Sequence, residues 1–126
     1  AHGQPRRGLL HVVPAPVEHD APGDGSLQVA DLGPMDLELG GHLEQVSLGF
    51  RTWGRLHAAG DNAVIVLHAL TGDSRAGGDG GWWEPLIGPG RAVDTDRAFV
   101  VCANVLGGCQ GSTGPASIDP LTGRPY

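Results

Sequence analysis

The sequence contains no lysine, so all of its permanently basic side chains are arginine, and its formal net charge is −6 over 126 residues. A P-loop depends on a lysine at a fixed position, so this class of nucleotide site is excluded. Nucleic acids and anionic membranes are bound through basic patches that displace counterions from phosphates. The charge balance therefore predicts no nucleic-acid partner and no membrane partner.

Cysteine is equally scarce, with only Cys102 and Cys109 in the chain. Their spacing matches no C-x-x-C pattern, so we predict no metal site and expect free, buried thiols in a cytoplasmic protein. No apolar run reaches the roughly 20 residues that a bilayer-spanning helix needs. Arg6-Arg7 precede a short apolar run that His11 interrupts, which argues against an export signal.

The first 33 residues contain four prolines and five glycines and show no apolar period. A segment of this kind cannot bury enough surface to offset the entropy lost on ordering, so residues 1–33 are predicted to form a flexible tail. Residues 34–126 are predicted to form the folded part. An α/β domain routinely takes about 200–250 residues, so an α/β fold in this chain is expected to be incomplete.

Two short runs with apolar residues at every second position follow the tail and predict a β-hairpin with one buried face. The runs and the glycine pair between them are Leu37 and Leu39, then Gly40-Gly41, then Val46, Leu48 and Phe50. His42, Glu44 and Arg51 are expected to be solvated residues at the edge of these strands.

Two continuous apolar runs, residues 63–67 and 98–103, predict strands that are covered on both faces. About thirty residues separate them, which suits neighbouring parallel strands joined by a crossover. The crossover shows little helical character beyond a possible turn near residues 82–86. Residues 104–126 are predicted to be loop; their glycines at 108, 111 and 114 open no helix, which makes a phosphate site improbable.

The turn His68-Ala69-Leu70-Thr71-Gly72 directly follows the first buried run. In acyl transfer on an α/β-hydrolase fold, one of the two backbone N–H donors that stabilise the oxyanion comes from the turn after an early central strand. Leu70 is the candidate donor, through its amide rather than its side chain. Spacing alone leaves open the alternative that the turn is an ordinary exit from a strand.

Several ordered blocks resemble the amino-terminal part of homoserine O-acetyltransferases. They are TWG at 52–54, NAVIVLHALTGDS at 62–74, GWW at 81–83, IGPGRAVDTDRAFVVCANVLGGCQGSTGPAS at 87–117 and P-x-TGRPY at 120–126. The resemblance covers roughly residues 35–126. It implies the amino-terminal portion of an α/β-hydrolase fold, in which an amino-terminal β-hairpin precedes the first central strands.

The resemblance also implies an acyltransferase of methionine biosynthesis. Acetyl-CoA, as co-substrate, acylates a serine, and the hydroxyl of L-homoserine then accepts the acetyl group with the help of a histidine oriented by an aspartate. The family's oxyanion-hole amide falls on Leu70, and its substrate-specificity segment falls on Thr71, Gly72, Asp73 and Ser74. Arg75 stands where many relatives have histidine. No bound cofactor and no metal are expected, and a homodimer in the cytoplasm is implied.

No G-x-S-x-G elbow occurs in the chain, so the catalytic serine, aspartate and histidine are expected to lie outside it, and the chain alone is expected to be inactive. Ser74, Ser112, Ser117, His57 and His68 lack the strand–turn–helix setting that exposes an activated hydroxyl. Three alternatives stay open: a homoserine O-succinyltransferase, a serine O-acetyltransferase, or a non-catalytic glycine-rich binding module.

Overall fold

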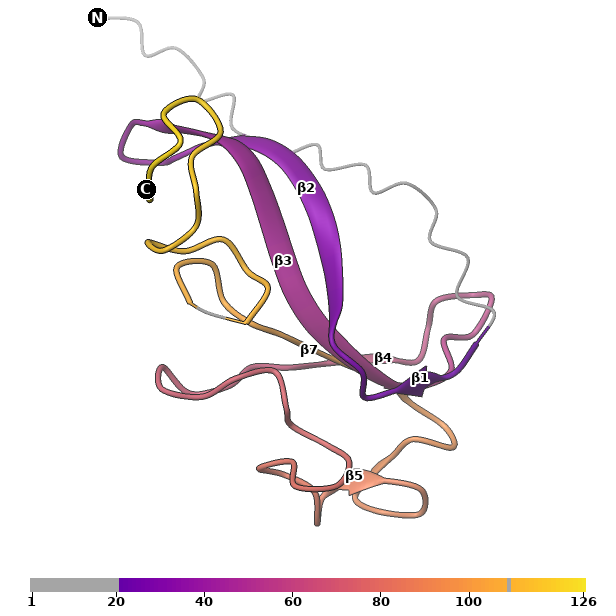
Figure 1. The fold of residues 1–126 in the computed structure, drawn as a ribbon. Coiled ribbons are helices and arrows are strands. Elements are labelled where there is room, and N and C mark those ends of the chain that lie inside the picture. The colour runs from indigo at the N-terminus through magenta and orange to yellow at the C-terminus, as the bar shows by residue number, and fades with distance from the viewer. Residues whose placement is uncertain (1–20, 109) are drawn as a thin grey trace, which may run out of the picture.

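A computed structural model describes residues 21–108 and 110–126, and within them the regular structure consists of strands (Figure 1). The strands are β1 (Gly23–Asp24), β2 (Gln28–Asp36), β3 (His42–Gly54), β4 (Ala63–Val66), β5 (Ile87–Gly88), β6 (Val93–Asp94) and β7 (Phe99–Ala103). The main sheet has the order β1-β3-β7-β4, with β2 paired to the long strand β3, and β5 and β6 form a separate two-stranded ladder.

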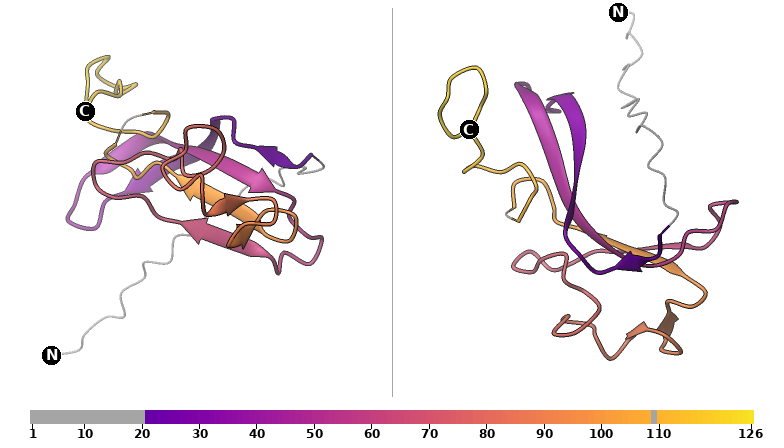
Figure 2. Two further views of the ribbon diagram at one scale, coloured as in Figure 1. Left: turned by 90° about the horizontal axis from the view of Figure 1, so that it is seen from below. Right: turned by 45° about the vertical axis from the view of Figure 1, so that its right-hand side comes forward.

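Strands β7 and β4, the last two in the order of the sheet, are parallel, with Ala63 opposite Phe99 and Val66 opposite Cys102. This confirms the predicted pair of neighbouring strands joined by a crossover. Residues 67–98 form that crossover and lie to one side of the sheet (Figures 1 and 2). As predicted, residues 82–86 form turns, closed by hydrogen bonds such as Leu86 N–H to Trp83 O at 2.9 Å. The crossover also contains the short β5–β6 ladder, which was not predicted.

The prediction that both faces of β4 are covered is wrong for the described chain. Val66 is buried, but Ile65 is 74% exposed and Leu67, just past the strand, is exposed as well. Alternate residues of a strand face opposite sides of the sheet, and here one side packs against the crossover while no described segment covers the other. The apolar run of β4 therefore predicts more burial than the described residues provide.

The predicted tail boundary at residue 33 is corrected, because β2 begins at Gln28 and pairs with β3 from Phe50 to His42. Glycine and proline obscured this strand. Gly33 has φ of +71° and lies at an irregularity in the pairing, and Pro34 follows it on a strand that pairs on one side only. A bulge and an unpaired edge are where a strand tolerates these residues. Residues 1–20 of the predicted tail lie outside the described residues.

The hairpin turn is also longer than predicted. Gly40 and Gly41 do form it, with φ of +95° and +101°. However, Leu37 and Leu39 belong to the turn rather than to the strand, because Leu37 N–H donates to Gly41 O at 3.0 Å and closes a five-residue loop. Leu39 is exposed. At the open end of this turn, exposed His42 pairs through Nδ1 with Asp36 Oδ1 at 2.6 Å, as its predicted edge position suggests.

A small apolar core lies between the sheet and the crossover. Its buried members are Trp53, Val66, Ala76, Ile87, Val100 and Cys102, with Val93 and Ala98 packed against them. Cys102 is free and fully buried, as predicted, and burial raises the pKa of its thiol to about 11. Cys109 lies outside the described residues. The core thus joins strands β3, β4 and β7 to the crossover that follows β4.

The loop after β7 packs directly on β3 at Gly49. Ser112 Oγ accepts the Gly49 N–H at 2.9 Å, and Asn104 N–H donates to Gly49 O at 2.8 Å. A Cβ atom at position 49 would lie 2.4 Å from the backbone oxygen of Gln110. Glycine is therefore required here by the close approach of two backbones.

We expect Gly49→Ala to destabilise the intact protein by about 1–3 kcal/mol, because the loop backbone must move away from β3. The measurement is the thermal unfolding midpoint, with Gln45→Ala, an exposed position on the same strand, as the control. An unchanged midpoint in Gly49→Ala would contradict the close approach of the loop to β3.

Candidate active site

The turn after β4 exposes the residue that the sequence singled out. Leu70 is 94% exposed, and within residues 21–108 and 110–126 its N–H donates to no acceptor. The turn itself is closed one step further on, by Gly72 N–H donating to Ala69 O at 2.8 Å. The hydrogen bond that closes the turn therefore does not use the Leu70 N–H, which stays available as a donor.

A cavity of about 280 Å³ lies beside this turn, between it and the loop that follows β7. Its lining consists of His68, Leu70, Thr71, Gly72, Asp73, Asn104, Val105, Gly108 and Gln110. The structure thus brings four of the predicted site residues, Leu70 to Asp73, to one cavity. Ser74 is not among the lining residues: it is fully buried, and its Oγ has no hydrogen-bond partner in the described chain.

His68 joins the two loops that border the cavity. Its Nε2 accepts the Val105 N–H at 3.3 Å, and its Nδ1 lies 2.6 Å from Ala69 O. A ring nitrogen that accepts a hydrogen bond carries no proton, so these two contacts assign the proton to Nδ1. With its lone pair engaged, His68 acts here as a link between loops rather than as a base.

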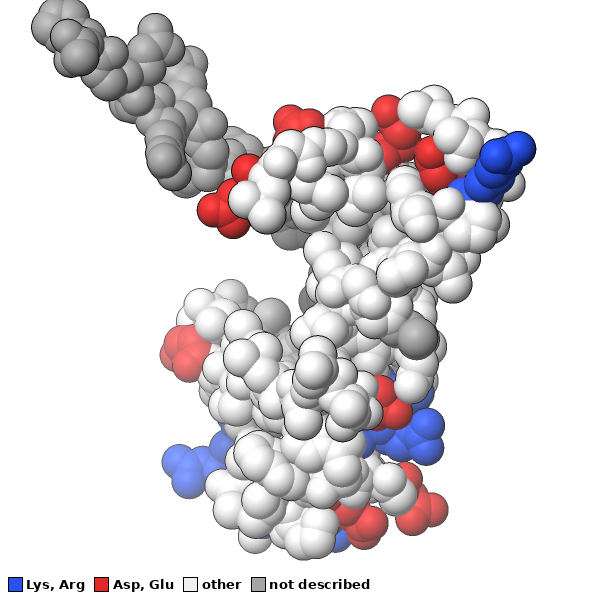
Figure 3. All heavy atoms as spheres, turned by 90° about the vertical axis from the view of Figure 1, so that its left-hand side faces the viewer, with Lys and Arg blue, Asp and Glu red and all other residues white. Residues whose placement is uncertain are grey.

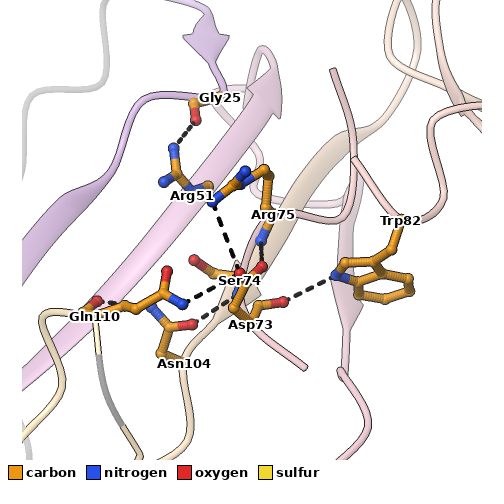
Figure 4. Close-up of polar contacts among 8 residues, drawn as sticks. All are labelled: Gly25, Arg51, Asp73, Ser74, Arg75, Trp82, Asn104 and Gln110. Carbon is orange, nitrogen blue, oxygen red and sulfur yellow. Dashed lines mark hydrogen bonds and ion pairs between the residues drawn. The ribbon is translucent and has the colours of Figure 1, made fainter. Parts of the chain in front are cut away.

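Asp73 is the polar centre of the turn (Figure 4). Its carboxylate accepts the Arg75 N–H at 2.8 Å and the Gln110 amide at 3.2 Å, and its main-chain oxygen accepts the Trp82 indole N–H at 2.9 Å. The Arg75 N–H does most to hold the pKa of Asp73 below its usual value, against the opposing effect of burial. Gln110 and the charges of Arg75 and Arg51 lower that pKa further.

Arg51 was expected to be a solvated edge residue, and the structure corrects this. Its side chain is partly buried beside the turn, where it donates to Gly25 O at 2.6 Å (Figure 4). Its Nε is buried without a hydrogen-bond partner in the described part of the chain. The inward position has a physical reason, because the Asp73 charge offsets part of the cost of burying a guanidinium group.

Asn104 and Gln110 are cavity residues that the sequence reasoning missed. Asn104 Oδ1 accepts the Ser74 N–H at 2.6 Å, and Asn104 Nδ2 donates to Gln110 O at 2.7 Å (Figure 4). A signal was present: Asn104 directly follows an apolar strand, and the carboxyl ends of adjacent parallel strands meet at one edge of a sheet. Gln110, in an irregular loop, had no such signal.

The other serines and histidines that could suggest a triad do not form one. Ser112 Oγ donates to Asn104 O at 2.6 Å, and Ser117 Oγ accepts the Gly114 N–H at 3.0 Å. His57 pairs with exposed Asp61 at 2.9 Å. Within the described ranges, no serine hydroxyl is hydrogen-bonded to a histidine ring.

A second, more open cavity of about 470 Å³ lies along the glycine-rich loop, whose Gly108, Gly111 and Gly114 all contribute to its lining. The loop continues in turns rather than in a helix, and the prediction against a phosphate site stays a prediction. Some of its amides are already engaged: Thr113 N–H donates to Ser47 O, and Gly114 N–H to Ser117 Oγ.

Asp73 is the one Asp, Glu or Arg side chain among the described residues that line the two cavities. On the face seen in Figure 3, acidic residues lie toward the two ends, arginines lie apart from one another, and the middle consists mostly of uncharged residues. In the described part of the chain, no cluster of three or more His, Cys, Asp or Glu side chains could hold a metal ion. Nor do these residues include a helix long and apolar enough to cross a membrane.

Comparisons with known proteins connect this geometry to one group of enzymes. No family model matches the chain. The homoserine O-acetyltransferase of Symbiobacterium thermophilum is 56% identical over 100 residues, which are 74% of this chain and 26% of the relative. That of Mycobacterium sp. strain KMS is 49% identical over 120 residues, 90% of this chain and 32% of the relative. A homoserine O-succinyltransferase from Nocardioides sp. is 56% identical over 99 residues, 74% of this chain and 27% of the relative.

Solved structures agree. Homoserine O-acetyltransferase from Bacillus anthracis matches with a TM-score of 0.75 and 32% identity over 80% of this chain and 30% of that one. Esterase E22 matches with a TM-score of 0.73 and 32% identity over 80% of this chain and 31% of that one. The resemblance read from the sequence and the α/β-hydrolase fold class are therefore confirmed, and the chain spans about a quarter to a third of the length of these curated relatives.

The hydrogen bonds of Asp73 make part of the stability pH-dependent. Because its pKa is lower in the native state than in the unfolded chain, its contribution is present above the ordinary value of 3.8 and is lost as the pH falls through the lower native value. We expect the difference in unfolding midpoint between the wild type and Asp73→Asn to shrink as the pH falls from about 6 to about 2.

Thermal unfolding of the intact protein at several pH values measures this difference. Asp79→Asn, which removes a charge from the exposed part of the same crossover, controls for the general loss of negative charge. A wild-type advantage over Asp73→Asn that grows toward low pH would contradict the assigned direction.

Proposed function

We propose that this chain, related in sequence to homoserine O-acetyltransferases over most of its length, supplies the oxyanion-binding side of an acyltransferase. The intact enzyme would move an acetyl group from acetyl-CoA to the hydroxyl of L-homoserine, a step of methionine biosynthesis. The observation that carries the proposal is the Leu70 N–H, which has no acceptor in the described chain and lies beside a cavity at the carboxyl end of a parallel strand.

The chemistry follows from what an acyl transfer demands. Attack on the acetyl carbonyl turns its oxygen into an oxyanion, and a preorganised N–H stabilises that charge without having to reorganise during the reaction. Leu70 N–H is a donor of this kind. This chain spans 26–32% of the length of its relatives. We assign the serine that would carry the acetyl group, its histidine and its aspartate to the part of that length which this chain does not span.

The specificity segment is assigned to Thr71, Gly72 and Asp73, which line the cavity beside Leu70. Ser74, the fourth residue of that segment, is fully buried. We assign it to holding the segment in place, through its N–H bond to Asn104, rather than to contact with substrate. No bound cofactor is proposed, since acetyl-CoA enters as co-substrate. A homodimer in the cytoplasm remains part of the proposal.

Two other activities have a specific observation in their favour. The Nocardioides relative named as a succinyltransferase is as similar to this chain as the first acetyltransferase, at 56% identity each. Esterase E22 has a TM-score within 0.02 of the Bacillus anthracis acetyltransferase, 0.73 against 0.75. Both activities need the same oxyanion donor, so they differ from the proposal in the acyl group and in the acceptor.

Leu70→Pro, which removes the amide proton, is expected to lower kcat of the intact enzyme by about 100- to 1000-fold, the usual cost of one oxyanion donor. Leu70→Ala keeps the amide and is expected to stay within about threefold of the wild type, because the exposed side chain does not make the contact. Replacing the same amide by an ester removes the N–H without the steric effect of proline. Equal rates for the wild type and the ester variant would rule out Leu70 as the donor.

The acyl donor and acceptor are tested by steady-state rates of the intact enzyme with acetyl-CoA or succinyl-CoA, each offered with homoserine, serine or water alone. We expect kcat/KM to be highest for acetyl-CoA with homoserine. Faster turnover with succinyl-CoA would favour the succinyltransferase, faster acetylation of serine would favour the serine enzyme, and release of acetate at the same rate without an acceptor would favour an esterase. No reaction with any pair would favour a non-catalytic binding module.

A further inference from the structure

We propose that Asn104 is a positioning residue that holds the Leu70 amide in place by tying the turn after β4 to the loop after β7. The inference rests on the proposed function, because it concerns the donor that the function requires. Asn104 itself is assigned no contact with substrate. Its role is to fix the backbone on which that donor is carried.

The side chain of Asn104 is built into the wall between the two loops. The residue is 3% exposed, and both ends of its amide group bind main-chain atoms. Oδ1 accepts the Ser74 N–H at 2.6 Å, and Nδ2 donates to Gln110 O at 2.7 Å (Figure 4). A buried polar group with both ends satisfied specifies one arrangement of its partners.

The backbone of Asn104 is held independently of its side chain. Its N–H donates to Gly49 O at 2.8 Å, and its carbonyl oxygen accepts the Ser112 hydroxyl at 2.6 Å. Strand β3 and the loop after β7 therefore hold residue 104 before the turn after β4 is considered. The Asn104 side chain, bonded to the Ser74 N–H, then fixes the turn relative to this held backbone.

The turn is held at a second place, by the residue that follows Asn104. We call the two contacts, Asn104 with Ser74 and Val105 with His68, the clamp. Val105 N–H donates to His68 Nε2 at 3.3 Å, while Asn104 holds Ser74. Leu70 lies between these two anchored residues. Between the anchors the main chain makes one turn bond, from Gly72 N–H to Ala69 O, and Asp73 is also tied to Gln110 and Trp82. The orientation of the Leu70 amide therefore depends on His68 on one side and, on the other, on the segment 73–74 that Asn104 holds through Ser74.

Only asparagine meets the chemical demand at this position. The site needs an acceptor toward Ser74 and a donor toward Gln110 on one short, neutral, planar group. Aspartate keeps the acceptor but turns a second oxygen toward the Gln110 carbonyl, and leucine has neither function. A lost partner would leave the buried Ser74 N–H unsatisfied, which favours movement of the turn toward solvent.

A small displacement is sufficient to affect the chemistry. A misplacement of about 1 Å by a residue outside the reacting groups can cost about 100-fold in rate. Since the oxyanion donor acts on the reacting carbonyl rather than on the rest of the substrate, the loss should appear in kcat and leave KM nearly unchanged.

The test uses the intact enzyme with Asn104→Leu, Asn104→Asp and the control Thr113→Val. Thr113 is buried in the same loop and its hydroxyl accepts the Ser47 N–H at 2.9 Å, but it does not line the cavity of Leu70. Its variant therefore removes one buried hydrogen bond without touching the clamp. Rates of acetyl transfer and thermal unfolding midpoints are measured for all three.

We expect Asn104→Leu to lower kcat by about 10- to 100-fold with KM within about threefold, and Asn104→Asp, which keeps the bond to Ser74, to fall between it and the wild type. Thr113→Val is expected to lower the unfolding midpoint with kcat within about twofold. A kcat of Asn104→Leu within that same range, or an equal loss in Thr113→Val, would overturn the proposal. If Asn104→Leu does not fold, Asn104→Asp is judged by the same comparison.

Amide hydrogen exchange of the intact protein without substrate separates this inference from the proposed function. We expect Asn104→Leu to raise exchange in residues 68–74 while exchange in β3 and β7 stays as in the wild type. If the wild type transfers no acyl group but exchange rises in this way, the proposed function fails and the clamp stands. Unchanged exchange in residues 68–74 would overturn the clamp whatever the activity.

Discussion

The parallel pairing of β4 with β7 is the constraint on which the candidate site depends. The β4–β7 ladder ends with Val66 opposite Cys102, so both strands leave the sheet at their carboxyl ends, side by side and in the same direction. The turn after β4 and the loop after β7 are thereby brought side by side, although their sequences lie about thirty residues apart. An antiparallel pairing would have sent them to opposite edges, and neither the cavity nor its hydrogen bonds could form.

Polar burial is concentrated in and around the loop after β7, where it packs on β3 and on the turn after β4. Ser74, Asn104, Ser112 and Thr113 are buried polar residues, and most of their bonds run between main chain and side chain rather than between side chains. Backbone groups in irregular loops have no ladder to satisfy them, so side-chain amides and hydroxyls take that part. The region is therefore held by directional bonds, whereas the apolar core beneath it joins the strands. The exposed Ile65 on β4 marks a face that this core does not reach.

The sequence predicts the long strands of this fold better than the residues at which they begin and end. The continuous apolar runs identified β4 and β7 and their parallel relation, because long-range pairing of buried strands leaves a strong local pattern. The same reasoning started the folded part too late, at residue 34, although β2 begins at Gln28, because a bulge at Gly33 and an edge position allow glycine and proline within a strand. In the site, Leu70 to Asp73 were found from the turn and the family resemblance. Arg51 and Gln110 were not, since their positions depend on contacts between distant segments, which no local pattern encodes.

The proposed role of the Leu70 amide accounts for the similarity of one segment to proteins named as acetyltransferases, a succinyltransferase and an esterase. A backbone N–H at the end of a strand binds the carbonyl oxygen that every acyl group has, and it is indifferent to the rest of the acyl chain and to the acceptor. What it requires is a turn whose internal hydrogen bond forms elsewhere, as the bond from Gly72 N–H to Ala69 O does here, and a support that keeps the free amide from rotating. In the proposed function, the physical task of this segment is to present one unpaired donor. Discrimination between acyl groups and acceptors must come from side chains around that donor, such as Thr71 and Asp73, and from the part of the relatives' length that this chain does not span.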